Sequence, residues 1–182
     1  MDHKLLRGKE YTINQPVLNE APMALNGRKT IFIVDDDPDD RQIILDSFLE
    51  NSALIDYIFI ENGEQLMDTL HNAGPGELPA LILLDLNMPG LPGLQALKEI
   101  KNHSNFKHIP TIVLTTSQLQ KDQDLSYKFG ANCFLQKPGT YTELVDITHA
   151  VLKLWFHPFL SPDNEIVGKS EKSESPGDSR PL

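Results

Sequence analysis

The sequence predicts one α/β domain in which a five-stranded parallel β-sheet is covered by helices on both faces. Short apolar runs alternate with longer amphipathic segments from Thr30 to about His157, which is the pattern of successive strands and helices around a parallel sheet. The third apolar run, LILL at 81–84, is unbroken, as expected of a central strand that is buried on both faces. A chain of 182 residues is long enough for one such domain with flanking segments.

The five predicted strands are the short apolar runs themselves. We expect them at residues 31–34, 57–60, 81–84, 111–114 and 132–136. Asp85 directly follows the third run and Pro110 directly precedes the fourth, and residues of these types are typical of strand boundaries. No internal repeat or second alternating pattern indicates another domain.

The first helix has the clearest start signal of the five predicted helices. Asp37 can act as its N-cap, and Pro38 then occupies the first helical position, where its fixed φ angle and missing amide hydrogen cost little. Its inward face is expected to consist of Ile43, Ile44, Leu45, Phe48 and Leu49.

The later helices are predicted from apolar spacing and from helix-ending residues. The second helix carries Leu66, Met67 and Leu70, and the third covers roughly 94–102. Gly130 marks the C-terminal end of the fourth helix. The last helix is expected from Thr140 to about His157, where Pro158 ends it.

The chain ends differ in composition from the alternating region. Residues 1–28 show no sustained period, and residues 161–182 contain many serines and few apolar residues. A segment of the second kind buries too little apolar surface to offset the entropy of ordering. We therefore expect an N-terminal extension (1–28), a domain at 29–160 and a disordered tail (161–182).

Charge and cysteine content limit the classes of partner and compartment. The formal net charge of −10 and the pI near 4.9 disfavour general binding to nucleic acid or to anionic membranes, which requires clustered Lys and Arg. The single cysteine, Cys133, excludes an intramolecular disulfide and favours a reducing compartment. No apolar run resembles a secretory signal or a membrane span. We expect a cytoplasmic protein.

Polar residues that can bind ligands or react follow four of the five predicted strands. Asp35 and Asp36 come after the first, Asp85 after the third, Thr115 after the fourth and Lys137 after the fifth. In an open parallel sheet these positions meet at one edge, where ligands bind. Three neighbouring carboxylates repel one another unless a cation neutralises them, and hard oxygen ligands suit magnesium. The sequence therefore predicts an Mg²⁺ site at this edge.

The other acids of the cluster have structural explanations. Asp37 is expected to cap the helix, while Asp39 and Asp40 lie in its first turn, where negative charge is favourable to the helix dipole. A calcium-binding loop is excluded, because its sixth position would be Asp40 instead of glycine and its twelfth would be Asp46 instead of glutamate.

Four segments in order, VDDD (34–37), LLDLNMPGLPG (83–93), VLTTS (113–117) and FLQKP (134–138), together resemble the receiver domain of two-component response regulators. That resemblance implies the flavodoxin-like receiver fold and spans roughly residues 29–157. The strings NCF and LKLWF, and the lack of an attached output domain, are similar to the small stand-alone regulators paired with bacterial phytochromes.

The resemblance implies a role for each residue of the predicted site. Asp85 would be the phosphoacceptor, a carboxylate nucleophile that takes a phosphoryl group from a sensor histidine kinase. Asp36, Asp85 and the backbone carbonyl of Asn87 would coordinate Mg²⁺, with Asp35 acting directly or through a bound water. The protein would then be a signalling partner of the kinase, for which a phytochrome is one candidate, and would not be an enzyme acting on external substrates.

The same resemblance implies a switch. Lys137 would pair with Asp85 and then with a phosphoryl oxygen, while Thr115 would hydrogen-bond another oxygen. Movement of Thr115 would let Phe134 turn inward and reshape the surface of the fourth helix, fifth strand and last helix. At the position of Phe134 many relatives carry tyrosine, so part of the family's switch lacks its hydroxyl here.

The last predicted helix has more apolar residues than one core-facing stripe requires. Its expected inward face is Leu144, Ile147, Val151 and Leu154, and further apolar residues are Val145, Leu152, Trp155, Phe156 and Phe159. A surplus of this kind is typical of a protein interface. We expect a homodimer or kinase docking through this helix, with simple core coverage as the competing explanation.

Two other function classes were weighed against the signalling receiver. A magnesium-dependent phosphohydrolase with Asp85 or Asp36 as nucleophile remains the alternative, although the chain offers Asn87 where such enzymes need an acid and no segment for a substrate cap. A dinucleotide-binding protein is disfavoured because no glycine-rich phosphate loop is present.

Overall fold

The fold is described from a computed structural model of the chain, in which residues 28–51 and 55–156 are described. The strands are β1 (Lys29–Val34), β2 (Ile55–Ile60), β3 (Leu81–Leu84), β4 (Thr111–Thr115) and β5 (Cys133–Gln136). The helices are α1 (Pro38–Leu49), α2 (Gly63–Asn72), α3 (Gly93–Asn102), α4 (Gln120–Phe129) and α5 (Tyr141–Phe156). Strand and helix alternate throughout, as the sequence predicted.

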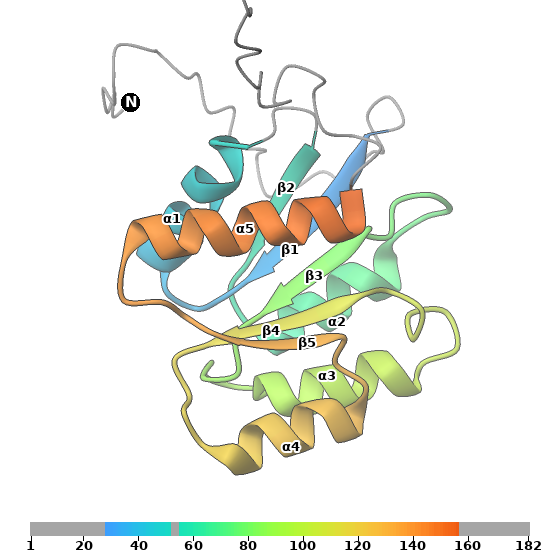
Figure 1. Cartoon of the computed structure of the whole chain (residues 1–182). Coiled ribbons are helices and arrows are strands. Elements are labelled where there is room, and N and C mark those ends of the chain that lie inside the picture. The colour runs from blue at the N-terminus through green and yellow to red at the C-terminus, as the bar shows by residue number, and fades with distance from the viewer. Residues whose placement is uncertain (1–27, 52–54, 157–182) are drawn as a thin grey trace, which may run out of the picture.

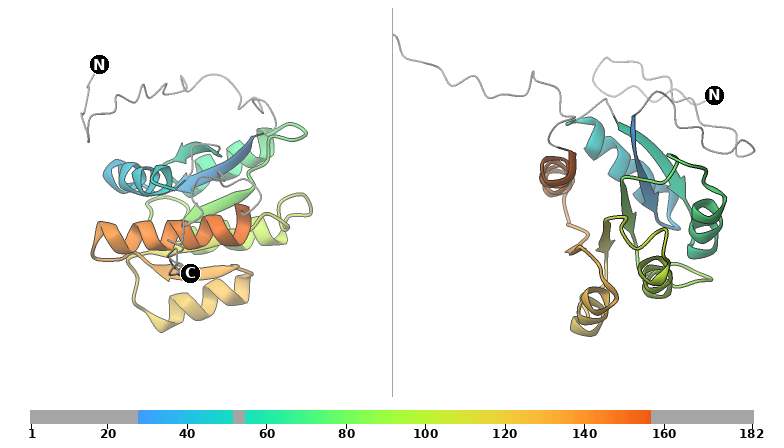
Figure 2. Two further views of the ribbon diagram at one scale, coloured as in Figure 1. Left: turned by 45° about the horizontal axis from the view of Figure 1, so that its top comes forward. Right: turned by 90° about the vertical axis from the view of Figure 1, so that its right-hand side faces the viewer.

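The five strands form one parallel sheet in the order β2-β1-β3-β4-β5. Helices α1 and α5 lie against one face, α2 and α3 lie against the other, and α4 lies beside α3 at the β5 edge (Figures 1 and 2). All four residues of β3 are buried, which confirms the central position inferred from its unbroken apolar run. The predicted fold class is therefore correct.

Two apolar clusters, one on each face of the sheet, make the core. Alternate residues of a strand point to opposite faces, so Phe32 and Val34 of β1 pack toward α2 and α3, whereas Ile31 and Ile33 pack toward α1 and α5. Each of these side chains is almost completely buried, and burying one of this size contributes about 1.5–3 kcal/mol. The two clusters hold β1 and β3 at the centre of the molecule.

Boundary predictions hold to within two residues for the strands. Strand β4 includes Thr115, which was expected just after the strand, and β1 and β2 each begin two residues earlier than predicted. Helix α1 begins as expected: Asp37 has extended backbone angles, and its side chain accepts hydrogen bonds from the amides of Asp39 and Asp40.

The predicted inward face of α1 is wrong for two residues. Ile43 and Leu49 are 43% and 44% exposed. The buried positions of this helix are Arg41, Ile44, Ser47 and Phe48, whose spacing defines one face of a 3.6-residue helix. The buried face of α1 follows this spacing and not the apolar residues alone, so it includes an arginine and a serine.

One residue assigned to the inward face of α5 is also exposed. Leu154 has 75% of its surface accessible, whereas Leu144 and Val151 are buried. Thr148, also buried, donates its hydroxyl to the carbonyl of Ser47 on α1, which fixes the side of α5 that faces the neighbouring helix. Leu154 is therefore a solvent-facing apolar residue of α5.

Several expectations concern residues outside those described. The predicted N-terminal extension (1–28) falls there except for Arg28, and the predicted tail (161–182) falls there entirely. The predicted helix end at His157 and Pro158, and the apolar Phe159, also lie outside. Among the described residues, none of the helices combines the length and apolarity that crossing a membrane requires.

Gly93 brings the start of α3 into close contact with the segment that follows β3. Its amide donates to the carbonyl of Leu86 at 3.2 Å, and a β-carbon at this position would lie 2.1 Å from the carbonyl oxygen of Asp85. These are backbone atoms, which cannot rotate away. The absence of a side chain at Gly93 therefore lets the start of α3 pack directly against the backbone of Asp85.

Replacing this glycine tests how tightly the segment is packed. We expect Gly93→Ala to lower the free energy of unfolding by about 1–3 kcal/mol, because the added methyl overpacks a rigid contact. Urea unfolding followed by circular dichroism measures the change. Gly139→Ala is the matched control, since a β-carbon there meets nothing within 4 Å. Equal stability of the wild type and Gly93→Ala would contradict this packing.

Candidate functional site

The register of the sheet places the ends of β1 and β3 side by side. Val34 pairs with Leu84, so Asp35 and Asp85 are the next residues of adjacent strands, and the Asp85 amide donates to the carbonyl of Val34 at 2.9 Å. Connections leave β1 and β3 in opposite directions across the sheet, and this point of reversal is where open α/β sheets bind ligands.

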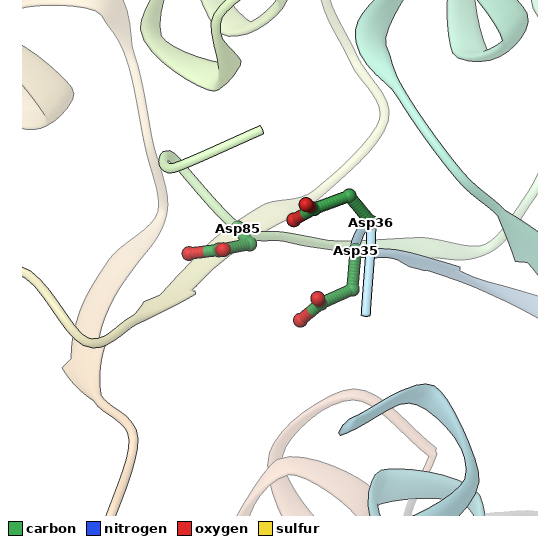
Figure 3. A group of neighbouring side chains, drawn as sticks. All are labelled: Asp35, Asp36 and Asp85. Atoms are coloured by element: carbon green, nitrogen blue, oxygen red, sulfur yellow. The ribbon is translucent and has the colours of Figure 1, made fainter. Parts of the chain in front are cut away.

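Three carboxylates meet at this edge. One oxygen each from Asp35, Asp36 and Asp85 lies within 4.8 Å of the others, and Figure 3 shows the three side chains gathered at the ends of the two strands. Asp35 and Asp85 are buried, at 2% and 5% exposure, while Asp36 is exposed. Two such charges 4 Å apart repel by about 4 kcal/mol at an effective dielectric constant of 20.

The donor set fits a hard divalent cation. Carboxylate oxygens are the ligands that Mg²⁺ and Mn²⁺ prefer, and Asp36, one of the three aspartates, is exposed to solvent. The three aspartates predicted to form a metal site are therefore brought together. The role of the Asn87 backbone carbonyl as a metal ligand stays a prediction.

Lys137 is delivered to the site by the pairing of β4 with β5. Its amide donates to the carbonyl of Thr115 at 2.8 Å. The ammonium Nζ lies 2.6 Å from Asp35 Oδ2, 2.5 Å from Asp40 Oδ2 and 3.9 Å from Asp85 Oδ2. The expected ion pair with Asp85 is thus present as the longest of three, and the two shorter partners are Asp35 and Asp40.

Burial and charge act in opposite directions on this cluster. Burial raises the pKa of Asp35 above its usual value, and the hydrogen bond and charge of Lys137 offset that rise only in part. Burial alone would lower the pKa of Lys137, but its hydrogen bonds to Asp35 and Asp40 outweigh this and raise that pKa. The ammonium therefore stays charged at neutral pH.

Arg41 is a second cation beneath the acid cluster. The first turn of α1 brings its guanidinium Nη1 to 2.6 Å from the carbonyl of Asp35 and 3.2 Å from that of Asp36. It also pairs with Glu61 at 3.5 Å and lies over the ring of Phe59. Arg41 thus fixes the backbone of the two aspartates that follow β1.

Thr115 is completely buried at the end of β4. Its hydroxyl oxygen accepts from the Ser117 amide at 3.3 Å and from the Asn87 side chain at 3.5 Å. The Asn87 amide group also donates to Thr116 at 3.2 Å. These contacts connect the segment after β3 with the segment after β4.

Phe134 lies on β5 next to β4 and pairs with Val113. It is half-buried and packs against the cluster beneath α2 and α3. Its amide donates to the Tyr127 hydroxyl on α4 at 3.3 Å. Phe134 therefore lies between the buried sheet and α4, with part of its side chain accessible.

Two residues of the site were missed as functional candidates from the sequence. Asp40 was assigned only to the helix dipole, and Arg41 was not considered. The spacing of Arg41, Ile44 and Phe48 along one helix face was the available signal for the buried arginine. No comparable signal predicts that Asp40 reaches Lys137, because the two residues are 97 positions apart.

Comparison with known protein families identifies the family of this domain. The model of the response regulator receiver domain matches residues 31–149, which includes every strand end described above. This chain belongs to the receiver domain family.

Individual relatives agree over almost their whole length. The response regulator Rcp1 of Synechocystis sp. is 31% identical over 140 residues, which cover 75% of this chain and 95% of Rcp1. The crystal structure of the phosphorylated cyanobacterial phytochrome response regulator RcpA has a TM-score of 0.67 at 30% identity, covering 72% of this chain and 96% of RcpA.

The Mn²⁺-bound crystal structure of Rcp1 gives a TM-score of 0.63 at 32% identity, covering 70% of this chain and 94% of that protein. These similarities confirm the resemblance to phytochrome-associated regulators inferred from the sequence. None of them supports the phosphohydrolase alternative.

Removing the ammonium of this receiver domain should destabilise it in a pH-dependent way. We expect Lys137→Met to lower the free energy of unfolding by about 3 kcal/mol near pH 8, because Asp35 loses its cation. Without Lys137 the already raised pKa of Asp35 rises further. A carboxyl group whose pKa is higher in the folded state binds its proton more tightly there, so protonation stabilises the folded state. This stabilisation is lost as pH rises through the folded-state pKa.

Urea unfolding of Lys137→Met in a metal chelator measures this penalty, which should be smaller at about pH 4.5 than at about pH 8. Lys121→Met, which removes an exposed lysine on α4, is the control and should be nearly neutral. A penalty that is independent of pH would contradict the electrostatic account of Lys137.

Proposed function

We propose that this receiver domain accepts a phosphoryl group from a sensor histidine kinase on Asp85, in the presence of Mg²⁺, and signals through contacts made by α4, β5 and α5. The observation that carries the proposal is the convergence of Asp35, Asp36 and Asp85 around one point, with Lys137 beside them. The functional domain is taken as residues 29–160, flanked by the segments 1–28 and 161–182.

Asp36 and Asp85 are assigned as direct Mg²⁺ ligands, with the carbonyl of Asn87 as a third and Asp35 acting directly or through water. The site of this chain offers the same kind of donor set that a hard divalent ion requires, and its relative Rcp1 has been solved with Mn²⁺. A bound ion would supply charge neutralisation for the incoming phosphoryl oxygens.

Asp85 is the nucleophile of the proposed transfer. Its Oδ1 accepts from the Leu86 amide at 2.8 Å, and its Oδ2 is the oxygen nearer Lys137. A carboxylate oxygen of Asp85 bonds to phosphorus as the bond between phosphorus and the histidine nitrogen of the kinase breaks. The product is an acyl phosphate, whose charge Lys137 and the Thr115 hydroxyl stabilise by position.

The phosphorylated state is proposed to change the α4–β5–α5 surface. Thr115 is buried, contacts Asn87 two residues beyond Asp85, and lies in the β4–β5 pair that also contains Phe134. A phosphoryl group that draws the Thr115 hydroxyl toward itself would open space for Phe134 to turn inward. The Phe134 backbone amide also donates to the Tyr127 hydroxyl, so a shift of β5 that accompanies this movement would reach α4.

A phytochrome-type sensor kinase is proposed as the partner. The reason is the similarity to RcpA, which is a cyanobacterial phytochrome response regulator. Transfer from such a kinase would take place in the cytoplasm. The acidic charge of the chain disfavours nucleic acid as the target, so the output is assigned to protein contacts.

Phosphorylation can be tested with a small donor. Incubating the protein with acetyl phosphate and Mg²⁺ should add the mass of one phosphoryl group, located at Asp85 by peptide mapping. Asp85→Asn should show no addition, and a chelator should abolish it in the wild type. Incorporation that persists in Asp85→Asn, or catalytic turnover of phosphomonoesters, would contradict the proposal.

A homodimer through α5 is proposed as part of the signalling mechanism. Leu154 is 75% exposed and Trp155 is partly buried on the same helix. On the α4 side, Tyr127 is exposed as well. Exposed apolar and aromatic side chains are typical of surfaces that associate, and a twofold dimer would bury the same patch from both copies.

Replacing the exposed leucine tests this interface. We expect Leu154→Arg to raise the dimer dissociation constant about tenfold or more, because a charge would be buried at the proposed contact. Light scattering over a dilution series measures the mass. Ile43→Arg, the same change at an exposed apolar residue of α1, is the control. A wild-type protein that stays monomeric at high concentration, with and without phosphorylation, would contradict dimerisation.

A further inference from the structure

Lys137 has three carboxylate partners, and they differ in burial. The Asp35 and Asp85 side chains are 3% and 6% exposed, whereas that of Asp40 is 40% exposed. The Lys137 side chain is 13% exposed. Asp40 is therefore the partner on the solvent side of the lysine, and the other two lie on the protein side.

Asp40 comes from a different element from the other partners. It lies in the first turn of α1, where the Asp37 side chain caps the helix, and it reaches across to the residue that follows β5. The distance from Lys137 Nζ to Asp40 Oδ2 is 2.5 Å, against 3.9 Å to Asp85 Oδ2. Because charge attraction weakens with distance, the ammonium is held mainly at the Asp35 and Asp40 side of the site.

The metal-binding group of the described residues contains Asp35, Asp36 and Asp85, but not Asp40. The geometry therefore does not indicate that Asp40 would bind a metal ion. The favourable position of an acid in the first helical turn explains its charge, but it does not require the side chain to contact Lys137. The contact with the lysine needs a separate explanation.

We propose that Asp40 is a positioning residue that competes with the phosphoryl group for Lys137 and thereby tunes how readily the site is phosphorylated. This inference rests on the proposed function and names a regulation of that same site. When Asp85 carries a phosphoryl group, Lys137 turns toward it and gives up Asp40. The Asp40 carboxylate can be released at low cost because water solvates it, whereas the buried Asp35 cannot lose its partner so easily.

The proposal predicts a direction of change. Asp40→Asn removes a competitor for the Lys137 ammonium, so the phosphorylated form should become more stable relative to the unphosphorylated form. Asp39→Asn is the matched control: it removes the same charge from the same turn of α1, and among the residues described no ion pair involves Asp39. A difference between the two variants isolates the contact with Lys137 from the general loss of negative charge.

Beryllofluoride, which mimics a phosphoryl group on an aspartate, is the probe for the equilibrium. Its affinity is measured by calorimetry at saturating Mg²⁺ for the wild type and each variant, and Mg²⁺ affinity is measured separately. We expect Asp40→Asn to bind beryllofluoride about tenfold more tightly than Asp39→Asn, the worth of one charge-assisted hydrogen bond. The Mg²⁺ affinities of the two variants should be alike, and Asp40→Glu, which keeps the carboxylate, should bind beryllofluoride with wild-type affinity.

The outcomes separate this inference from the proposed function. If the wild type binds beryllofluoride through Asp85 but Asp40→Asn matches Asp39→Asn or binds more weakly, competition by Asp40 is refuted while the phosphoacceptor role stands. If the wild type fails to bind beryllofluoride with Mg²⁺, both proposals fall. Thermal unfolding of each variant shows whether the fold is retained, since a purely structural role would lower stability without strengthening binding.

Discussion

The repulsion among acidic side chains at one edge of the sheet is the constraint on which this site depends. Asp35, Asp36 and Asp85 are close enough to share one ion, and Asp40 adds a fourth carboxylate around Lys137. Two basic side chains offset part of this negative charge: Lys137 lies beside the carboxylates, and Arg41 lies beneath the backbone that carries two of them. This leaves a net negative site, which is the electrostatic condition for binding a divalent ion and then an anionic phosphoryl group.

The fold holds these charged groups close together despite their repulsion, because each one is attached to a strand or helix of fixed position. Parallel pairing of β1 with β3 fixes two of the aspartates, and pairing of β4 with β5 fixes Lys137 relative to Thr115. Gly93 lets α3 begin directly behind Asp85. The site is thus connected through hydrogen bonds and strand pairing to α4 and β5, the surface that is proposed to carry the signal.

The sequence predicted the fold well because its signals are local. A short apolar run such as 81–84 within an alternating strand–helix pattern indicates a buried strand, and polar residues directly after such strands lie at the same sheet edge. Asp85 and Lys137 could therefore be assigned to one site without coordinates. Helix faces were predicted less well, because the exposure of Ile43 and Leu154 depends on helix rotation and on which neighbours cover each face.

The partner choice of Lys137 could not be predicted for a different reason. Asp35, Asp40 and Asp85 all lie within reach of one long flexible side chain, and differences of about 1 Å in distance decide which pairs dominate. Such differences depend on the relative placement of α1, β3 and β5, which no local pattern encodes. The buried Arg41 was missed because arginine is rarely expected in a core-facing position.

The most direct measurement of the central claim is calorimetric binding of Mg²⁺ or Mn²⁺ to the wild type, Asp36→Asn, Asp85→Asn and the double variant, with Asp39→Asn as the charge-matched control. If one ion is shared, each single substitution should weaken binding about tenfold or more, and the double variant should lose much less than the sum of the two. Binding by Asp36→Asn and Asp85→Asn at wild-type affinity would show that these two carboxylates do not share an ion.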